Sequence, residues 1–285
     1  MIWTIANVFA ILALAIGSYT DLRTREVPDW LSHGTIYFGF ALNAILSIVY
    51  LDWHFIVYSV LGFALCFLLG LGMYKLGQWG GGDTKVIMGV GALVGLNPST
   101  LLIITFLVNT ILVGAVYGIG WSLFVALRNW KSFWKEYRQF TKTPAIIKVR
   151  LLLYVVVIFG LLTAFLWFPQ NRIMIIGAIA IIFFLTHFWI MIKVVEKACM
   201  IKEVNPSVLT EGDWIAEDVK VKGEVITGPG DLGVSLEQIA KLKKIGVRKV
   251  KVKYGIPFVP SFLIAFILAA MLGAWYLGIL QALYF

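Results

Sequence analysis

The sequence predicts an all-α polytopic membrane protein of about eight hydrophobic helices, one of them short, with a small cytoplasmic α/β domain inserted before the last helix. Of its 285 residues, 60% are hydrophobic and 14% are charged, and the mean hydropathy of +0.90 lies outside the range of soluble globular domains. Many apolar runs approach the roughly 20 residues that a helix needs to cross hydrocarbon. They lack the apolar and polar alternation of membrane barrel strands. A single long polar stretch interrupts them near the C-terminus.

The apolar runs give the predicted helices in chain order. They extend roughly over 2–19, 31–51, 55–76, 86–96, 100–127, 151–168, 173–192 and 258–280. The first is expected to be a retained span, because it lacks the basic start and small-residue cleavage site of a secretory signal. The fourth is too short for an ordinary span, so it is either a short helix buried among the others or half of a hairpin broken at Asn97-Pro98. Irregular ends at membrane depth need polar surroundings, which predicts a polar cavity near Asp83.

Basic residues predict the orientation. The connection 128–150 carries seven Lys and Arg residues against one acid, so it is expected on the cytoplasmic side. Counting spans outward puts 21–30, 75–85 and 193–257 on that side and the N-terminus outside. The net charge of +9 then follows from topology and contact with anionic membrane lipid. We therefore expect a multi-pass plasma-membrane protein with no nucleic-acid partner.

The polar stretch divides the chain into a membrane core of 1–193, a small domain of 194–256 and a final core helix in 257–285. Ser235 to Gln238 and Gly246 are the start and stop signals of a short helix. Alternation around Val250 to Tyr254 predicts a half-buried strand. About sixty residues form only a marginal core, so this domain is expected to lean on the membrane surface or on the helices.

Several chemistries find no support in the sequence. The histidines His33, His54 and His187 are isolated and form no zinc pair, so interfacial or packing roles are expected for them. Cys66 and Cys199 have neither metal-ligand spacing nor a disulfide framework. No nucleophile elbow and no phosphate-binding loop occurs. We therefore predict no metal and no cofactor.

Acids are few in the membrane part of the chain. Before Val194 they are Asp21, Glu26, Asp29, Asp52, Asp83 and Glu136. Ionisable groups at a span are costly, and Asp21 and Asp83 both abut apolar helices on the same predicted side. Two converging carboxyl groups share a proton, so the ionised one can activate water while the protonated one polarises a peptide carbonyl.

Each aspartate also has a plain structural explanation. Asp83 follows Gly80–Gly82, which can end one helix, and its carboxylate can cap the next helix at the positive end. Asp21 can belong to a charged connector in which Pro28 opens the next helix. The glycines lack Cβ atoms and can take φ above zero or admit a bound peptide strand. Capping and catalysis are compatible, and the residues alone leave both open.

Three ordered motifs resemble those of the type IV prepilin and preflagellin peptidases, the GxGD class of membrane aspartyl proteases. Residues 80–83 match G-x-G-D, the stretch from Asp21 to Asp29 resembles D-x-R…[IV]-P-[ND], and Ile256 to Phe262 is similar to the proline motif that opens the final helix. The resemblance covers residue 1 to about 127 and the last span. No C-x-x-C occurs, so the zinc insert and methylating activity of bacterial members are not expected, which favours the archaeal branch.

The resemblance implies an aspartic-type endopeptidase that removes the basic leader from precursors of pilin-like or archaellin subunits at the cytoplasmic boundary. Asp21 and Asp83 would be catalytic. The expected substrate-binding residues are Gly80, Gly81, Gly82, Lys85, Pro257, Phe258, Val259 and Pro260. Partners would be the precursors and membrane lipid, and a homo-oligomer is left open. The alternatives are an ion- or proton-coupled transporter using the same acids, although no second copy of residues 79–85 occurs, or an anchor that presents 194–256.

Overall fold

Long helices make up most of the protein. The computed structural model describes residues 2–221, 224–278 and 281. In these ranges, six helices are long and apolar enough to cross a membrane, namely α1 (Ile2–Thr24), α2 (Asp29–Val49), α3 (His54–Lys75), α5 (Leu102–Arg128), α7 (Pro144–Leu162) and α8 (Arg172–Val195). Two further apolar helices, α4 (Gly81–Val94) and α10 (Val259–Leu272), have 14 residues each. The helical membrane class is confirmed, but only six of the eight predicted helices reach spanning length.

α10 is shorter than the sequence predicts. The apolar run extends to about residue 280, but the helix ends at Leu272 because Gly273 takes the left-handed φ of 57°. A residue in this conformation terminates the helical hydrogen-bond ladder, and glycine adopts it without a Cβ clash.

α4 is a short helix buried among others, not half of a hairpin. It packs against α2 and α3, which approach closely through glycine. A Cβ on Gly91 would lie 2.5 Å from the carbonyl oxygen of Gly62. The Asn43 amide donates to the carbonyls of Ala92 and Leu93, both at 3.2 Å, and so satisfies the C-terminal end of α4. Protein groups thus meet the backbone requirements of a helix only about 21 Å long.

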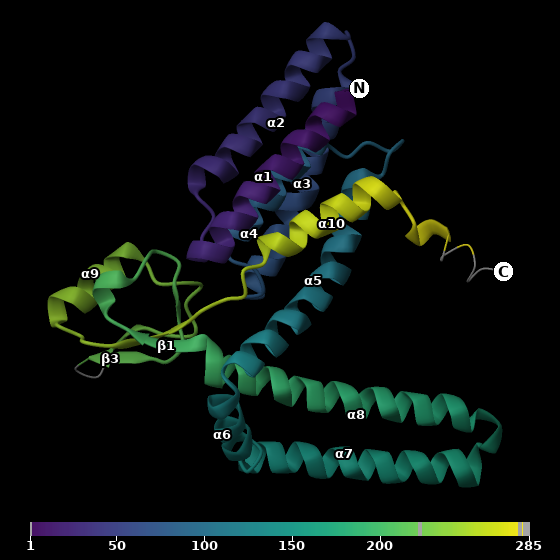
Figure 1. The fold of residues 1–285 in the computed structure, drawn as a ribbon, viewed down its shortest axis with the longest axis vertical. Coiled ribbons are helices and arrows are strands. Elements are labelled where there is room, and N and C mark those ends of the chain that lie inside the picture. The colour runs from purple at the N-terminus through teal and green to yellow at the C-terminus, as the bar shows by residue number, and fades with distance from the viewer. Residues whose placement is uncertain (1, 222–223, 279–280, 282–285) are drawn as a thin grey trace.

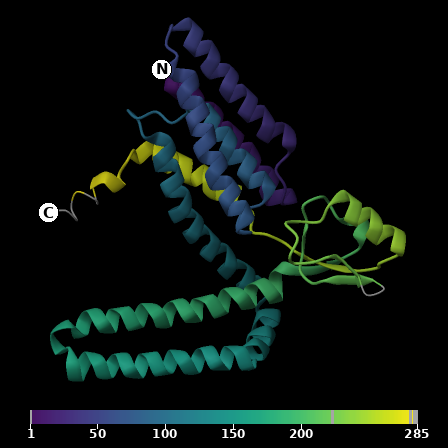
Figure 2. The ribbon, with the colours of Figure 1, turned by 180° about the vertical axis from the view of Figure 1, so that it is seen from behind.

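α7 and α8 form a hairpin that stands apart. Figures 1 and 2 show the two helices side by side, projecting away from α1–α4 and joined to them through α5 and α6 (Trp130–Phe140).

α6 was not predicted, because its aromatic residues lie within a strongly basic segment. Trp130, Trp134 and Tyr137 recur at helical spacing and stack on one another. Short irregular turns occur at η1 (Thr163–Trp167), η2 (Pro169–Asn171), η3 (Glu196–Met200) and η4 (Pro206–Val208).

The polar stretch forms a small α/β unit with its own core. Its elements are β1 (Ile201–Val204), β2 (Trp214–Ile215), β3 (Val219–Val221), β4 (Glu224–Thr227), α9 (Leu236–Ile245) and β5 (Val250–Lys253). The antiparallel sheet has the order β1-β5-β2, and β3 pairs with β4 in a hairpin. Ser235 and Gln238 form the predicted capping box of α9, and Gly246 ends this helix with φ 77°. The local signals therefore predicted α9 and β5 correctly.

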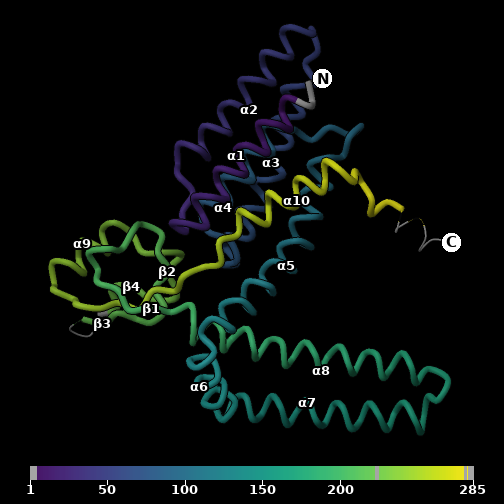
Figure 3. Tube along the Cα trace, in the orientation of Figure 1, coloured from purple at the N-terminus to yellow at the C-terminus, as the bar shows by residue number. Residues whose placement is uncertain are grey.

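The small unit packs against the connection that precedes α2, the last turn of α3 and the connection that follows α3. The Thr210 hydroxyl donates to the Glu26 carboxylate at 3.0 Å, and the Tyr74 hydroxyl donates to the Leu232 carbonyl at 3.0 Å. The Trp214 ring lies against Gly77, where a Cβ would be 2.9 Å from the ring. In Figure 3 the chain runs from β5 to the start of α10 as an extended segment. The unit thus leans on the helices, at the ends that carry the conspicuous acids.

Candidate active site

Asp21 lies inside the last part of α1, not in a connector. The helix continues to Thr24, and only 5% of the Asp21 surface is exposed. Its carboxylate Oδ2 accepts a hydrogen bond from the backbone N–H of Val259 at 3.0 Å. Val259 is the first residue of α10, where a negative charge is favoured by the helix dipole. The alternative in which Asp21 belongs to a connector is therefore wrong, and its carboxylate instead joins the end of α1 to the start of α10.

Asp83 is the third residue of α4, and Gly80 occupies the N-cap position. The carboxylate Oδ2 of Asp83 accepts from the backbone N–H of Gly80 at 2.9 Å. This contact is the acidic half of a capping box, so Asp83 does stabilise the start of the helix. Its Oδ1 has no hydrogen-bond donor among the described residues, which leaves one carboxylate oxygen for other chemistry.

The two aspartates belong to one site. α1 packs directly against α4, and the Asp21 carboxyl lies near enough for its charge to act on Asp83. No hydrogen bond joins the two carboxyl groups in the described structure, since each uses an oxygen to bind a backbone N–H. The two carboxyl groups therefore lie in one region of the structure without a direct hydrogen bond between them. Catalytic contacts are often loose in the absence of substrate.

The three glycines before Asp83 do not adopt the predicted backbone. None has a positive φ, and Gly80 is extended, with φ −74° and ψ 166°. The left-handed residue after α3 is Gly77, with φ 67°. A Cβ on Gly82 would lie 3.3 Å from the Val27 Cβ, whereas a Cβ on Gly81 would meet nothing within 4 Å. Close approach is thus required at Gly82, where the neighbour belongs to the first aspartate motif, and space remains beside Gly81.

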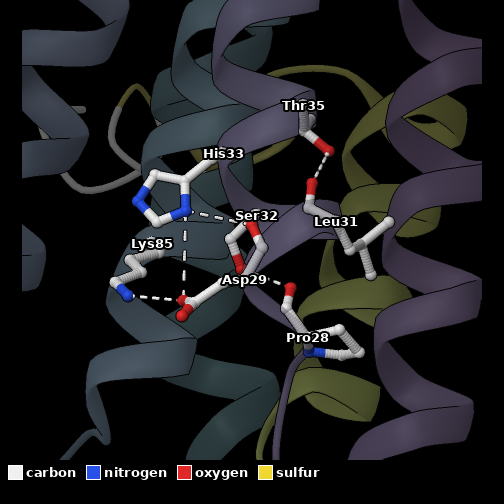
Figure 4. A network of polar contacts seen from close by, with 7 residues as sticks. All are labelled: Pro28, Asp29, Leu31, Ser32, His33, Thr35 and Lys85. Atoms are coloured by element: carbon white, nitrogen blue, oxygen red, sulfur yellow. Dashed lines mark hydrogen bonds and ion pairs between the residues drawn. The ribbon is translucent and has the colours of Figure 1, made fainter.

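Lys85 ties the first two motifs together. Its Nζ lies 2.6 Å from Oδ1 of Asp29, the first residue of α2 (Figure 4). The His33 ring nitrogen Nδ1 lies 3.0 Å from the Asp29 carbonyl oxygen and 3.9 Å from its carboxylate. The lysine side chain is 38% exposed and the aspartate side chain 73%, so solvent screens this pair. A substrate contact for Lys85 stays a prediction.

The proline motif at the start of α10 contacts Asp21 directly. Val259 donates to Asp21, while Pro260 occupies the first turn of α10, where its missing N–H costs nothing. The Phe258 ring centroid lies 6.1 Å from that of Trp79, the residue before the glycines. On its other side, a Cβ on Gly114 would be only 2.6 Å from Phe258 Cζ. Phe258 therefore fills the space between α5 and the α3–α4 connection. Pro257 precedes it in the extended segment.

Tyr117 on α5 is a site residue that the sequence reasoning missed. Its ring meets Phe258 edge-on at 6.4 Å, and it lies within electrostatic range of both Asp21 and Arg25. Its hydroxyl is buried and has no hydrogen-bond partner among the described residues. A tyrosine within an apolar helix is ordinary, so no local signal marks it. One turn further along α5, the Arg25 guanidinium lies over the Trp121 ring, 5.5 Å from its centroid. This contact shows that α5 lies beside the first aspartate motif.

The site can support acid–base chemistry on a peptide bond. Two carboxyl groups from different helices face one region, and backbone N–H groups hold one oxygen of each. Among the residues that the structure describes, no group of three or more His, Cys, Asp or Glu side chains could hold a metal ion.

Comparison with known proteins matches the region that carries both acids. The type IV leader peptidase family matches residues 8–119. The preflagellin peptidase of Methanocaldococcus jannaschii is 42% identical over 83 residues, which cover 29% of this chain and 35% of that protein. The preflagellin peptidase of Methanococcus maripaludis is 39% identical over 90 residues, or 32% of this chain and 39% of that protein.

A more distant relative is named prepilin peptidase EppA, from Methanothermobacter thermautotrophicus. It is 30% identical over 100 residues, which cover 35% of this chain and 26% of that protein. The matches thus span well under half the length of these relatives. No solved structure matches. The matched residues 8–119 include both Asp21 and Asp83, so this part of the chain is similar to the type IV leader peptidase family.

Proposed function

We propose that this protein is a membrane aspartyl endopeptidase that removes the basic leader peptide from precursors of pilin-like or archaellin subunits. The observation that carries the proposal is the meeting of Asp21 and Asp83, from separate motifs, at the ends of α1 and α4. The names of the related preflagellin and prepilin peptidases support this substrate class. Precursor proteins are then the partners, and membrane lipid surrounds the spans.

In the proposed reaction, Asp21 and Asp83 share one proton. The ionised carboxylate takes a proton from water, and the water oxygen attacks the scissile carbonyl carbon. The protonated carboxyl donates its proton to the carbonyl oxygen, giving a tetrahedral intermediate. When this intermediate collapses, the newly protonated carboxyl donates its proton to the leaving nitrogen and the C–N bond breaks. A hydroxyl of the intermediate gives its proton to the other carboxylate as the product carboxyl group forms, which regenerates the shared-proton pair.

The surroundings of the acids suit a bound peptide backbone. A Cβ on Gly81 would meet nothing within 4 Å, and the extended segment that contains Pro257 leads to Val259, whose N–H binds Asp21. A precursor helix has to unwind here, because a helical peptide bond is shielded by its own hydrogen bonds. The N–H groups of Gly80 and Val259 hold the two carboxylates in place, which reduces the reorganisation needed to reach the transition state.

We infer that the active site faces the cytoplasm in the plasma membrane. This inference rests on the basic residues of 128–150, which lie between α5 and α7, and on the positive-inside rule. We further propose a peptidase core formed by 1–193 and 257–285, interrupted by a cytoplasmic domain of 194–256. The archaeal relatives favour the archaeal branch of the family.

Co-expression with a precursor tests the proposed chemistry. Asp21→Asn and Asp83→Asn keep the shape of the side chains but remove the shared proton, so cleavage should fall by about 10²- to 10⁴-fold. The control is Asp52→Asn, which changes an exposed acid between α2 and α3 that pairs with His54. Cleavage is followed by the mobility shift of the precursor. Robust processing by either well-expressed active-site variant would refute the mechanism, and ion flux without a processed product would favour the transporter alternative.

A further inference from the structure

An apolar groove runs between α5 and α10, and its Tyr117 end lies within electrostatic range of Asp21. It encloses about 500 Å³ and is lined by Asn109, Leu112, Val113, Val116, Tyr117, Ile264, Leu268, Leu272 and Trp275. The α5 residues follow the spacing i, i+3, i+4, i+7 and i+8, and the α10 helix contributes i, i+4 and i+8. Both sets therefore form one face of a helix. In the described structure this face is largely uncovered, since Val116 is 72% exposed and Leu272 58%.

The polar atoms of the groove are mostly paired within the protein. The Asn109 carbonyl oxygen accepts from Trp275 Nε1 at 2.9 Å, and the Asn109 amide donates to the Ala265 carbonyl at 3.3 Å. The exception is the buried Tyr117 hydroxyl, which has no partner in the described part of the chain. The groove thus has an apolar wall, and the Tyr117 hydroxyl is buried behind one end of it.

That end is the one nearest the candidate active site. Tyr117 lies within electrostatic range of Asp21, and Asp21 binds the first N–H of α10. From there the groove leads away along both helices, from Tyr117 back to Asn109 on α5 and from Ile264 on to Leu272 on α10. Each path covers eight residues, or about 12 Å of helix. The groove therefore begins beside the acids and runs outward along two apolar helices.

We propose that this groove holds the apolar helix of the precursor during cleavage. The inference rests on the proposed function, because a peptide bond held at Asp21 and Asp83 must continue into the apolar helix of the same substrate. That helix needs an apolar surface that starts at the site and follows the membrane-spanning direction. The α5–α10 groove has this origin, direction and chemistry, as expected for a helix seated in an apolar groove.

Cysteine cross-linking tests the location of the substrate helix. Val116→Cys in the groove is compared with Val155→Cys, which changes an equally apolar residue, 61% exposed, on the α7–α8 hairpin. Both are made with Cys66→Ala, Cys199→Ser and Asp83→Asn, so that an uncleaved precursor with single cysteines along its apolar helix persists. We expect disulfides from position 116 to recur every three to four precursor residues, and at least about tenfold weaker cross-linking from position 155.

Other results would overturn the proposal. Equal cross-linking from both positions would mean that the precursor only diffuses along the lipid-facing surface. Cross-links between two copies of position 116 that precursor does not displace would assign the groove to a second copy of the chain. A lipid-phase quencher that reaches a probe at position 116 equally well with and without precursor would leave lipid as the occupant.

Kinetics separate this proposal from the proposed function. Val116→Trp should fill the groove and raise KM for the membrane-inserted precursor about tenfold, while cleavage of a short soluble peptide around the bond is unchanged. Val155→Trp is the matched control and should change neither substrate. Unchanged kinetics for both substrates in Val116→Trp would refute the groove while leaving the aspartyl mechanism intact. Activity retained in Asp21→Asn would instead refute the mechanism.

Discussion

α1 and α7 are both long apolar helices, but they occupy different surroundings. A third of the apolar window of α1 is buried inside the protein, compared with 11% for α7. α1 carries Asp21 and packs against α4 and α10, whereas α7 packs mainly against α8. The more hydrophobic helix is thus the less buried one. The hydropathy of a helix indicates whether it can lie in the membrane. It does not indicate whether the helix packs in the protein interior around a polar site.

The contacts within the two regions differ in kind. In the core, Gly91 and Gly62 bring two backbones together, so a side chain added at either position would meet backbone atoms that cannot rotate away. In the hairpin, a Cβ on Gly160 would meet the flexible end of the Ile179 side chain at 2.6 Å. Backbone contact through small residues is how helices pack tightly within a membrane. Such packing keeps Asp83 at a fixed position, and the hairpin has no comparable constraint among its described residues.

The largest effect is expected for Asp21→Ala, which removes both the catalytic role and the helix-capping role of this residue. Asp21→Ala removes the catalytic carboxyl and the acceptor for the Val259 N–H, so cleavage should fall by about 10²- to 10⁴-fold. It should also cost about 1 kcal/mol at the start of α10. Thermal unfolding in detergent should separate it from Asp21→Asn, which keeps an acceptor. Equal melting temperatures of the two variants would contradict the capping of α10 by Asp21.

The next effect concerns the hydroxyl of Tyr117. Tyr117→Phe should slow cleavage by about 10²-fold if the hydroxyl stabilises the reacting peptide, as loss of one such donor does elsewhere. Stability should not fall, because the removed group is buried without a partner in the described structure. Tyr154→Phe on α7 is the control, since its hydroxyl only accepts from Arg150 at 3.2 Å. Equal rates for the two variants would restrict Tyr117 to packing.

Alanine at glycine positions tests the difference in packing. Gly91→Ala should destabilise the core by about 1–3 kcal/mol, because its Cβ would overlap the Gly62 carbonyl oxygen. Gly177→Ala in the hairpin should be neutral or slightly stabilising, since its Cβ would meet nothing within 4 Å. The melting temperatures of both variants in the same detergent provide the measurement. A stable Gly91→Ala protein would show that α4 can shift, and its effect on cleavage would then show whether Asp83 depends on that packing.

The smallest expected effect is at the exposed ion pair. Lys85→Gln should change stability by at most about 1 kcal/mol, because solvent screens its contact with Asp29. Added salt should reduce the difference between this variant and the parent further. A several-fold rise in KM for the precursor with unchanged stability would support the predicted substrate contact of Lys85. An unchanged KM would leave the lysine with only its structural role.

Features that depend on residues close together in the chain could be predicted from the sequence alone. Apolar runs predicted the membrane helices, and start and stop signals predicted α9 from Ser235 to Gly246. The Asp83 cap was also predictable, because its acceptor and the Gly80 N–H are three residues apart. Such signals act within a few residues, and hydropathy and capping chemistry register them directly.

The partners of these side chains from distant parts of the chain could be found only in the folded protein. Asp21 binds an N–H that is 238 residues away, and Lys85 reaches a carboxylate 56 residues away. Tyr117 gains its place through the packing of α5 on α10, although nothing in its own segment distinguishes it from a lipid-facing tyrosine. These contacts depend on which helices pack together and where glycine allows them to approach. That is a property of the assembled interior, so no local pattern records it.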